Sequence, residues 1–171
     1  MDTSFEILTE RFRVRPLSRN DVEPLLAILG DAETMRWYLK PFDRDAVVRW
    51  IDSSAESYET NGFGMFAVEE RSSGELMGDC GPAIREVDGE PHVELGWHTR
   101  RDRWGEGIAT EAGIACRAWP FRTLDIDHLI SIIRPKNRQS WRVAEKLGMI
   151  IWKETRYKEF DVRVYRLNRS R

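Results

Sequence analysis

The sequence predicts an α+β domain, a layered mixed sheet of about seven strands with about four helices, and three observations support this. Residues 92–99 alternate apolar and polar side chains, as a half-buried strand does. Apolar residues between 108 and 119 recur at the spacing of one helical face. Gly105 and Gly107 lie between these two segments. A strand therefore leads through a glycine turn into a helix.

The bulk properties predict one domain that spans residues 1–171. A chain of 171 residues with 41 % hydrophobic content can form one core but hardly two. A net charge of −2 provides no basic field for nucleic acid, so a small-molecule or protein partner is expected. Cys80 and Cys116 lack the number and spacing of a zinc site or disulfide framework, and we expect no metal. Without a long apolar run, the chain is expected to be cytoplasmic, not bound to a membrane.

The N-terminal part predicts a strand and two helices. Alternation at residues 12–14, just before Pro16, is typical of an edge strand. Residues 18–21 offer helix caps ahead of a helical apolar pattern at 22–29. A second helix is predicted over 44–59, ending near Asn61 and Gly62.

The middle of the chain predicts antiparallel strands that lead into the glycine turn. The strand-like runs are residues 65–68, 76–78 and 93–95, with a hairpin turn at residues 88–90. The helix after the glycine turn is predicted to end at Trp119 and Pro120.

The pattern in the last third of the chain predicts one strand, then a helix, then two more strands. Residues 129–133 are rich in β-branched side chains, which favours an interior strand. A helix follows Asn137 and ends at Gly148, a typical C-terminal cap. Residues 149–152 and 162–167 complete the sheet.

The glycine turn has the properties of an anion site. Gly105 and Gly107 let the backbone turn sharply, so amide N–H groups can converge at the positive end of the following helix. A dinucleotide fingerprint would need a third glycine and a parallel βαβ unit, and a nucleotide triphosphate loop would need Gly-Lys-Ser/Thr. Neither pattern is present, so we expect the turn to bind the phosphate of a ligand other than a dinucleotide or a nucleotide triphosphate.

Taken together, several segments resemble the GNAT superfamily of acetyl-CoA-dependent N-acetyltransferases, in particular its RimJ/RimL-like branch. The resemblance covers nearly the whole chain. It implies a mostly antiparallel sheet with helices on both faces, splayed between the fourth and fifth strands. The segments that carry it are residues 9–17, 78–81, 94–98, 104–112, 134–140 and 143–149.

The resemblance implies where acetyl-CoA binds. In the family, main-chain amides of a Q/R-x-x-G-x-G/A turn hold the pyrophosphate. Gly107 and Ala109 occupy the last two marked positions here, and Trp104 stands where Gln or Arg is usual. The pantetheine arm would lie in the splay beside Trp97, His98 and Thr99, where a strand N–H polarises the thioester carbonyl. The predicted phosphate-binding residues are Arg103, Trp104, Gly105, Glu106, Gly107, Ile108 and Ala109.

The acceptor amine must lose a proton before it attacks, so a general base is expected. Glu94 is the first candidate, because some family members carry a basic glutamate there; the alternative is a solvated strand residue. Strand alternation places Glu94 and His98 on the same face. His98 is the reserve base, or else a surface or packing residue.

The departing thiolate benefits from an acid. Relatives place a tyrosine seven residues after the asparagine, but that position here is Ala144. Ser140, where RimL-like members present a hydroxyl, is therefore the predicted donor. Asn137 is read either as a helix N-cap only or as a cap that also hydrogen bonds the pantetheine arm.

For two further groups of residues, the sequence allows two alternative roles each. Arg100, Arg101 and Arg103 lie just before the turn and are either contacts for the 3′-phosphate of coenzyme A or solvated surface. Three tryptophans pack in the core or border the acceptor cleft: Trp37, Trp50 and Trp97.

The sequence thus predicts an N-acetyltransferase that moves the acetyl group of acetyl-CoA to a primary amine in a ternary complex. The acceptor is a protein N-terminus, a small amine or an amino acid, and the protein is a monomer or homodimer. The alternative is a catalytically weak GNAT-fold module that binds acyl-CoA or another protein.

Overall fold

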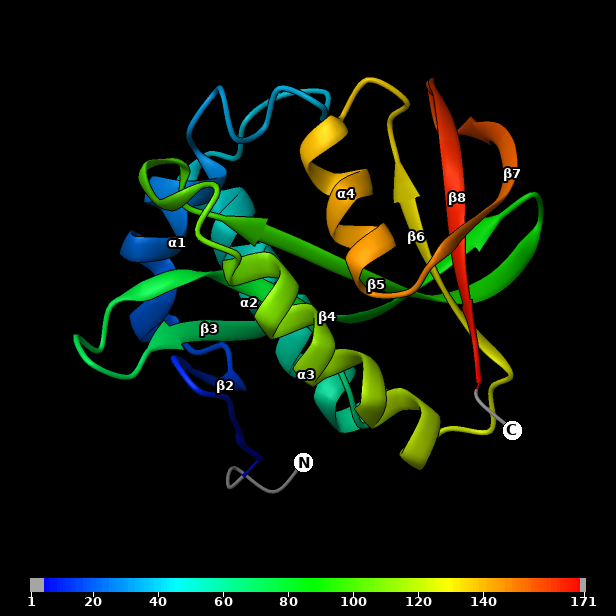
Figure 1. The fold of residues 1–171 in the computed structure, drawn as a ribbon. Coiled ribbons are helices and arrows are strands. Elements are labelled where there is room, and N and C mark those ends of the chain that lie inside the picture. Colours follow the sequence, from blue (N-terminus) through cyan, green and yellow to red (C-terminus); the bar gives the residue numbers. More distant parts are fainter. Residues whose placement is uncertain (1–4, 170–171) are drawn as a thin grey trace.

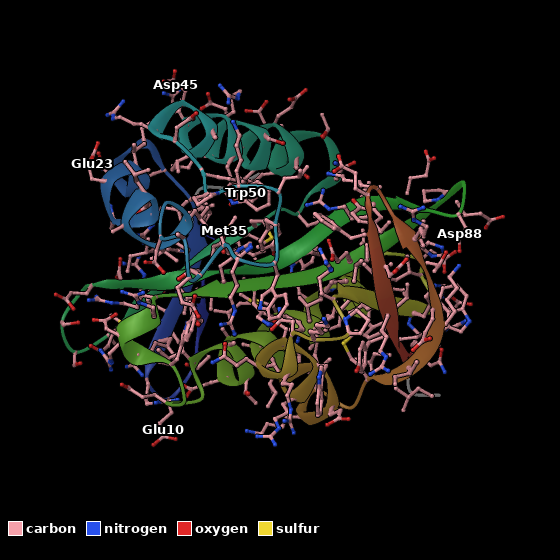
Figure 2. The ribbon with its side chains drawn as sticks, turned by 90° about the horizontal axis from the view of Figure 1, so that it is seen from above. Glu10, Glu23, Met35, Asp45, Trp50 and Asp88 are labelled. Atoms are coloured by element: carbon pink, nitrogen blue, oxygen red, sulfur yellow. The ribbon has the colours of Figure 1, made fainter. Side chains whose placement is uncertain are left out.

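The computed structural model describes residues 5–169, which form three layers. Helices α1 (Val22–Leu29) and α2 (Arg44–Asn61) cover one face of an eight-stranded sheet. Helices α3 (Ile108–Thr123) and α4 (Arg138–Lys146) cover the other (Figures 1 and 2). None of the helices in residues 5–169 is long and apolar enough to cross a membrane.

The sheet is mixed and mostly antiparallel, as predicted. Its order is β1-β2-β3-β4-β5-β6-β8-β7, and only β5 and β6 pair in parallel. Within the described residues it has one strand more than the seven predicted, because the short β1 pairs with β2. The strands are β1 (Ile7–Leu8), β2 (Phe12–Pro16), β3 (Phe66–Glu70), β4 (Leu76–Val87), β5 (Glu90–Thr99), β6 (His128–Ile133), β7 (Ile150–Tyr157) and β8 (Phe160–Asn168).

The β4–β5 hairpin is longer than the sequence predicted. Its turn at Asp88 and Gly89 has φ values of 54° and 84°, as a tight hairpin requires. β4 continues well beyond the predicted 76–78, because it pairs with β5 residue by residue from Gly78↔Thr99 to Val87↔Glu90. The hairpin therefore carries two long strands to the site described below.

Two predicted helix ends are confirmed and one is wrong. Gly62 and Gly148 follow α2 and α4 in the left-handed region, with φ values of 75° and 82°. Helix α3, however, continues past Pro120 to Thr123. A proline this close to the C-terminus costs one N–H bond, whereas its own carbonyl still accepts from Leu124 N at 2.8 Å.

The core has two main apolar clusters, one on each side of the sheet. One includes Phe12, Leu95 and Leu147, on the side of α3 and α4. The other includes Leu25 and Val47, on the side of α1 and α2. Cys80 and Cys116 are buried free thiols.

β5 and β6 separate after a very short stretch of pairing. The only register pair between them in the described chain is Glu94↔Ile130. Side chains then replace the ladder: the Ser131 hydroxyl donates to Leu95 O at 2.6 Å, and Ile132 N donates to Glu94 Oε1 at 3.3 Å. This is the splay that the resemblance implied between the fourth and fifth strands, which are β5 and β6 once β1 is counted.

Candidate active site

The glycine turn has the geometry that an anion site requires. Gly105 and Gly107 have φ values of 87° and 80°, and Gly107 is the N-cap of α3. Glu111 N makes the first helical bond to Gly107 O, at 3.0 Å. The amides of residues 108–110 therefore have no acceptor within the helix and are available to a bound anion.

A groove of about 300 Å³, here called the donor groove, runs from this turn toward the splay. Most of the predicted cofactor-binding residues line it. Glu106 does not, because its exposed carboxylate pairs with Arg103 at 2.8 Å. The predicted residues that line the groove are Trp97, His98, Thr99, Arg103, Trp104, Gly105, Gly107, Ile108, Ala109, Asn137 and Ser140.

Trp104, which replaces the Gln or Arg of the family motif, connects the turn to β5. Its indole Nε1 donates to Thr99 O at 3.0 Å. The end of β5 and the start of the turn are therefore held together by a side chain rather than by the strand ladder. This contact was not predicted from the sequence.

Each of the three arginines before the turn forms an ion pair with a carboxylate. Arg100 pairs with Asp102 at 2.8 Å, and Arg101 lies 3.6 Å from Asp31. Arg103 pairs with both Glu70 and Glu106, which raise its pKa.

Arg142 and Lys146 of α4 also line the donor groove, and no carboxylate of residues 5–169 lies within 4.0 Å of them. Sequence reasoning missed this pair. Their four-residue spacing on a helix was the available signal.

A second cavity of about 530 Å³, here called the acceptor cavity, meets the donor groove at the splay. Trp37, Trp50 and Trp97 all line it, as the cleft reading of these residues expected. The two cavities share a short junction through which two bound molecules could touch. The junction residues are Trp37, Tyr38, Trp97, His98, Asn137 and Ser140.

Glu94 lies in the wall of the acceptor cavity and not on a solvated strand face. Its side chain is 16 % exposed and accepts from Arg85 Nε at 3.1 Å and from Ile132 N at 3.3 Å. The carboxylate is thereby held in one position beside the splay, where it can face a bound amine.

His98 lies at the junction in a chain of hydrogen bonds. Its Nδ1 is 2.7 Å from Asp79 Oδ1, and its Nε2 is 2.7 Å from the Tyr38 hydroxyl. Asp79 is buried, and its other oxygen accepts from Trp50 Nε1 at 2.8 Å. Sequence reasoning missed Asp79 and Tyr38: strand pairing places Asp79 opposite His98, and no local pattern identifies Tyr38.

Asn137 caps α4, because its Oδ1 accepts from Ser140 N at 3.2 Å. This cap leaves the Nδ2 amide of Asn137 for other partners. Ser140 lines both cavities, whereas Ala144 is completely buried in the core. The first turn of α4 therefore supplies one hydroxyl at the junction.

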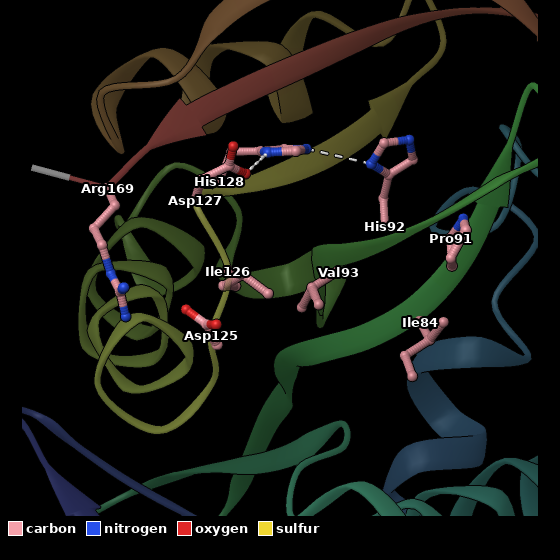
Figure 3. A pocket seen from close by; sticks show the side chains of 9 residues that line it. All are labelled: Ile84, Pro91, His92, Val93, Asp125, Ile126, Asp127, His128 and Arg169. Carbon is pink, nitrogen blue, oxygen red and sulfur yellow. Dashed lines mark hydrogen bonds and ion pairs between the residues drawn. The ribbon is translucent and has the colours of Figure 1, made fainter.

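A third cavity, of about 640 Å³, lies elsewhere, and none of the predicted site residues lines it (Figure 3). His92 Nδ1 lies 3.3 Å from His128 Nε2, and Asp127 contacts the other nitrogen of His128. Burial and the neighbouring His128 lower the pKa of His92. Across residues 5–169, no group of three or more His, Cys, Asp or Glu side chains could hold a metal ion.

Comparison with known proteins gives one family. The profile of the Acetyltransferase (GNAT) domain matches residues 11–150. The chain is 28 % identical to the uncharacterized protein YkkB of Bacillus subtilis (strain 168), covering 96 % of each chain. Among solved structures, the acetyltransferase from Agrobacterium tumefaciens str. C58 aligns with a TM-score of 0.81 and 26 % identity, over 96 % of this chain and 95 % of that one. RimL, a ribosomal L7/L12 α-N-protein acetyltransferase in complex with coenzyme A, shares the fold with a TM-score of 0.76 and 15 % identity, over 96 % of this chain and 98 % of that one.

Proposed function

The chain belongs to the GNAT acetyltransferase family, and from this premise we propose that it moves the acetyl group of acetyl-CoA to a primary amine by direct attack in a ternary complex. The observation that carries the proposal is the junction between the donor groove and the acceptor cavity. An amine in one can reach a thioester in the other without a covalent enzyme intermediate.

The donor groove suits coenzyme A in three ways. The free amides at the start of α3 would hold the pyrophosphate, as helix N-termini hold phosphates generally. The splay would take the pantetheine arm beside Trp97, His98 and Thr99, with Asn137 Nδ2 as a further donor. An unpaired strand N–H of β5 would polarise the thioester carbonyl. The RimL structure contains coenzyme A, which supports this assignment.

We assign the 3′-phosphate of coenzyme A to Arg142 and Lys146 rather than to the arginines before the turn. Arg100, Arg101 and Arg103 already neutralise carboxylates, so a phosphate would have to compete for them. Two neighbouring cations without such partners bind a phosphate at lower cost.

Glu94 is the proposed general base for the first proton. The acceptor arrives as an ammonium ion, and its proton must leave before the nitrogen can attack. A carboxylate accepts through several lone pairs, so Glu94 can receive this proton while it keeps the contacts to Arg85 and Ile132. Ser140 would hydrogen bond the departing sulfur from the junction.

The acceptor cavity favours an amine that also carries an acidic group and apolar surface. Its walls include Trp37, Trp50 and Phe42, together with cations that have no carboxylate within 4.0 Å in the described part of the chain. A polycation such as an aminoglycoside fits these charges poorly. The cations are Lys40, Arg49, Arg134 and Lys158.

A thiol-release assay tests the proposal. Acetyl-CoA is incubated with the protein and a panel of amino acids, small amines and N-terminal peptides, each peptide as free acid and as amide. Amine-dependent release of coenzyme A, with acetylated product seen by mass spectrometry, is the expected result. Tight binding of acetyl-CoA without release above hydrolysis across the panel would instead favour a binding module.

A further inference from the structure

Acetyl transfer to an amine involves a second proton that Glu94 does not account for. Once the C–N bond forms, the nitrogen still carries a proton that must leave, and the sulfur leaves as a thiolate that takes one up. A route from nitrogen to sulfur would balance both. The tyrosine that relatives use for the sulfur is replaced here by the buried Ala144.

The junction holds another tyrosine, supplied by a different part of the chain. Tyr38 lies between α1 and α2 and lines both the donor groove and the acceptor cavity. The backbone before it is anchored: Tyr38 N donates to Met35 O at 2.9 Å, and the Met35 side chain is buried against the sheet (Figure 2).

The contacts of His98 determine which of its nitrogens carries the proton. Trp50 Nε1 can only donate, so Asp79 Oδ2 must accept from it. A carboxylate also accepts at Oδ1, which puts the imidazole proton on Nδ1 of His98. Nε2 of the neutral ring is then an acceptor, and the Tyr38 hydroxyl donates to it.

We propose that Tyr38, His98 and Asp79 form a proton relay that takes the second proton from the acceptor nitrogen and returns it to the coenzyme A thiolate. This inference rests on the proposed function. The nitrogen gives its proton to the Tyr38 oxygen as the hydroxyl proton moves to His98 Nε2. The imidazolium is stabilised by Asp79. It then returns a proton through Tyr38 to the sulfur, and the relay ends as it began.

The charges around Tyr38 suit this role. Burial of the hydroxyl, followed by the negative charges of Glu94 and Asp79, raises the pKa of Tyr38, against a smaller opposite effect of Arg85. The phenol therefore stays protonated at neutral pH and can donate. Although 48 % of the residue's surface is accessible, its hydroxyl is directed to His98.

Within the relay, Asp79 is a positioning residue. Replacing its carboxylate with an amide tests this role separately from the role of His98. In Asp79→Asn the side-chain oxygen must face the obligate donor Trp50, so the NH2 group faces His98 Nδ1 and drives the proton to Nε2. The relay then has no acceptor for the Tyr38 proton. With Trp50→Phe added, the donor that fixes the introduced amide is gone. The amide can then rotate so that its oxygen faces His98 Nδ1, and activity should partly return.

The experiment measures kcat and KM for the full-length protein with the best amine from the panel. Tyr38→Phe and His98→Gln are expected to lower kcat at least about 30-fold, with KM for acetyl-CoA within about threefold. Asp79→Asn should lower kcat by a similar factor, and adding Trp50→Phe to Asp79→Asn should raise kcat again by at least about threefold. His92→Gln, a histidine of β5 outside both cavities, is the matched control.

Three outcomes overturn the relay. The first is folded Tyr38→Phe with kcat within about twofold of wild type. The second is an Nε2–H tautomer for neutral His98 in ¹⁵N NMR of the wild-type protein, a measurement that no folding defect can affect. The third is no amine-dependent turnover by the wild type, which overturns the proposed function as well.

Discussion

Asp79 and His98 are cross-strand partners in β4 and β5, and their side chains meet at 2.7 Å. The carboxylate is completely buried and the imidazole is 10 % exposed, so the pair forms part of the wall between the core and the two cavities. A buried carboxylate needs donors for its oxygens, and here Trp50 and His98 supply them. The long hairpin thus delivers an oriented histidine to the junction.

Replacing Glu94 tests the general base. We expect Glu94→Gln to lower kcat about 100-fold or more, because the amide cannot take the ammonium proton. Glu90→Gln, on the same strand but exposed and outside both cavities, is the control. Thermal melting should show both variants folded; unchanged turnover in Glu94→Gln would remove the residue from the mechanism.

The assignment of the 3′-phosphate predicts a selective effect. Arg142→Ala and Lys146→Ala should each raise KM for acetyl-CoA roughly 5- to 20-fold, because a charge-assisted contact is lost. With acetyl-dephospho-CoA, which lacks that phosphate, the variants and wild type should be alike. Arg101→Ala, which removes only an exposed partner of Asp31, is the control. Equal effects on both donors would contradict the assignment.

Replacing Gly107 with alanine should affect both the stability of the protein and its affinity for acetyl-CoA, and the two effects can be separated. With φ at 80°, an alanine there is strained by about 1 kcal/mol or somewhat more. The strain also displaces amides from the phosphate, so KM for acetyl-CoA should rise. Gly74→Ala is a matched control, because Gly74 has φ at 73° and open space around it but lies away from the groove. Both variants should lose stability in urea, and only Gly107→Ala should lose affinity.

Glu111 anchors the N-terminal segment to the start of α3. It accepts from Thr9 Oγ1 at 2.6 Å, from Arg11 N at 2.9 Å and from Arg11 Nε at 2.8 Å. Burial favours a higher pKa, but these bonds outweigh it and the pKa of Glu111 is lowered from its ordinary 4.5. We expect Glu111→Gln to cost about 1–3 kcal/mol at neutral pH in urea unfolding.

The pH dependence of that difference has a definite sign. Because the folded-state pKa is lowered, the stabilisation is fully present above the unfolded value of about 4.5 and is lost as the pH falls through the folded value. Wild type and Glu111→Gln should therefore converge in acid. A difference that stays constant from pH 7 to pH 3 would show that the carboxylate charge is not the cause.

Much of the fold could be predicted because its signals are local. The glycine turn at Gly105 and Gly107, the caps at Gly62 and Gly148 and the hairpin at Asp88 depend on backbone conformations that few residues tolerate, so each is visible in a short window. The length of β4 and the end of α3 were misjudged, because pairing and packing with distant residues decide them.

For the site, the sequence by itself determined the main-chain part: a contiguous glycine turn with free amides and a following helix that orients them. Only the tertiary structure decided the rest. It brought Tyr38, Asp79 and His98 together from three separate segments, turned Glu94 into the splay, and placed Arg142 and Lys146 along the groove. Main-chain chemistry is encoded in consecutive residues, whereas side-chain chemistry depends on which strands pair and where they separate.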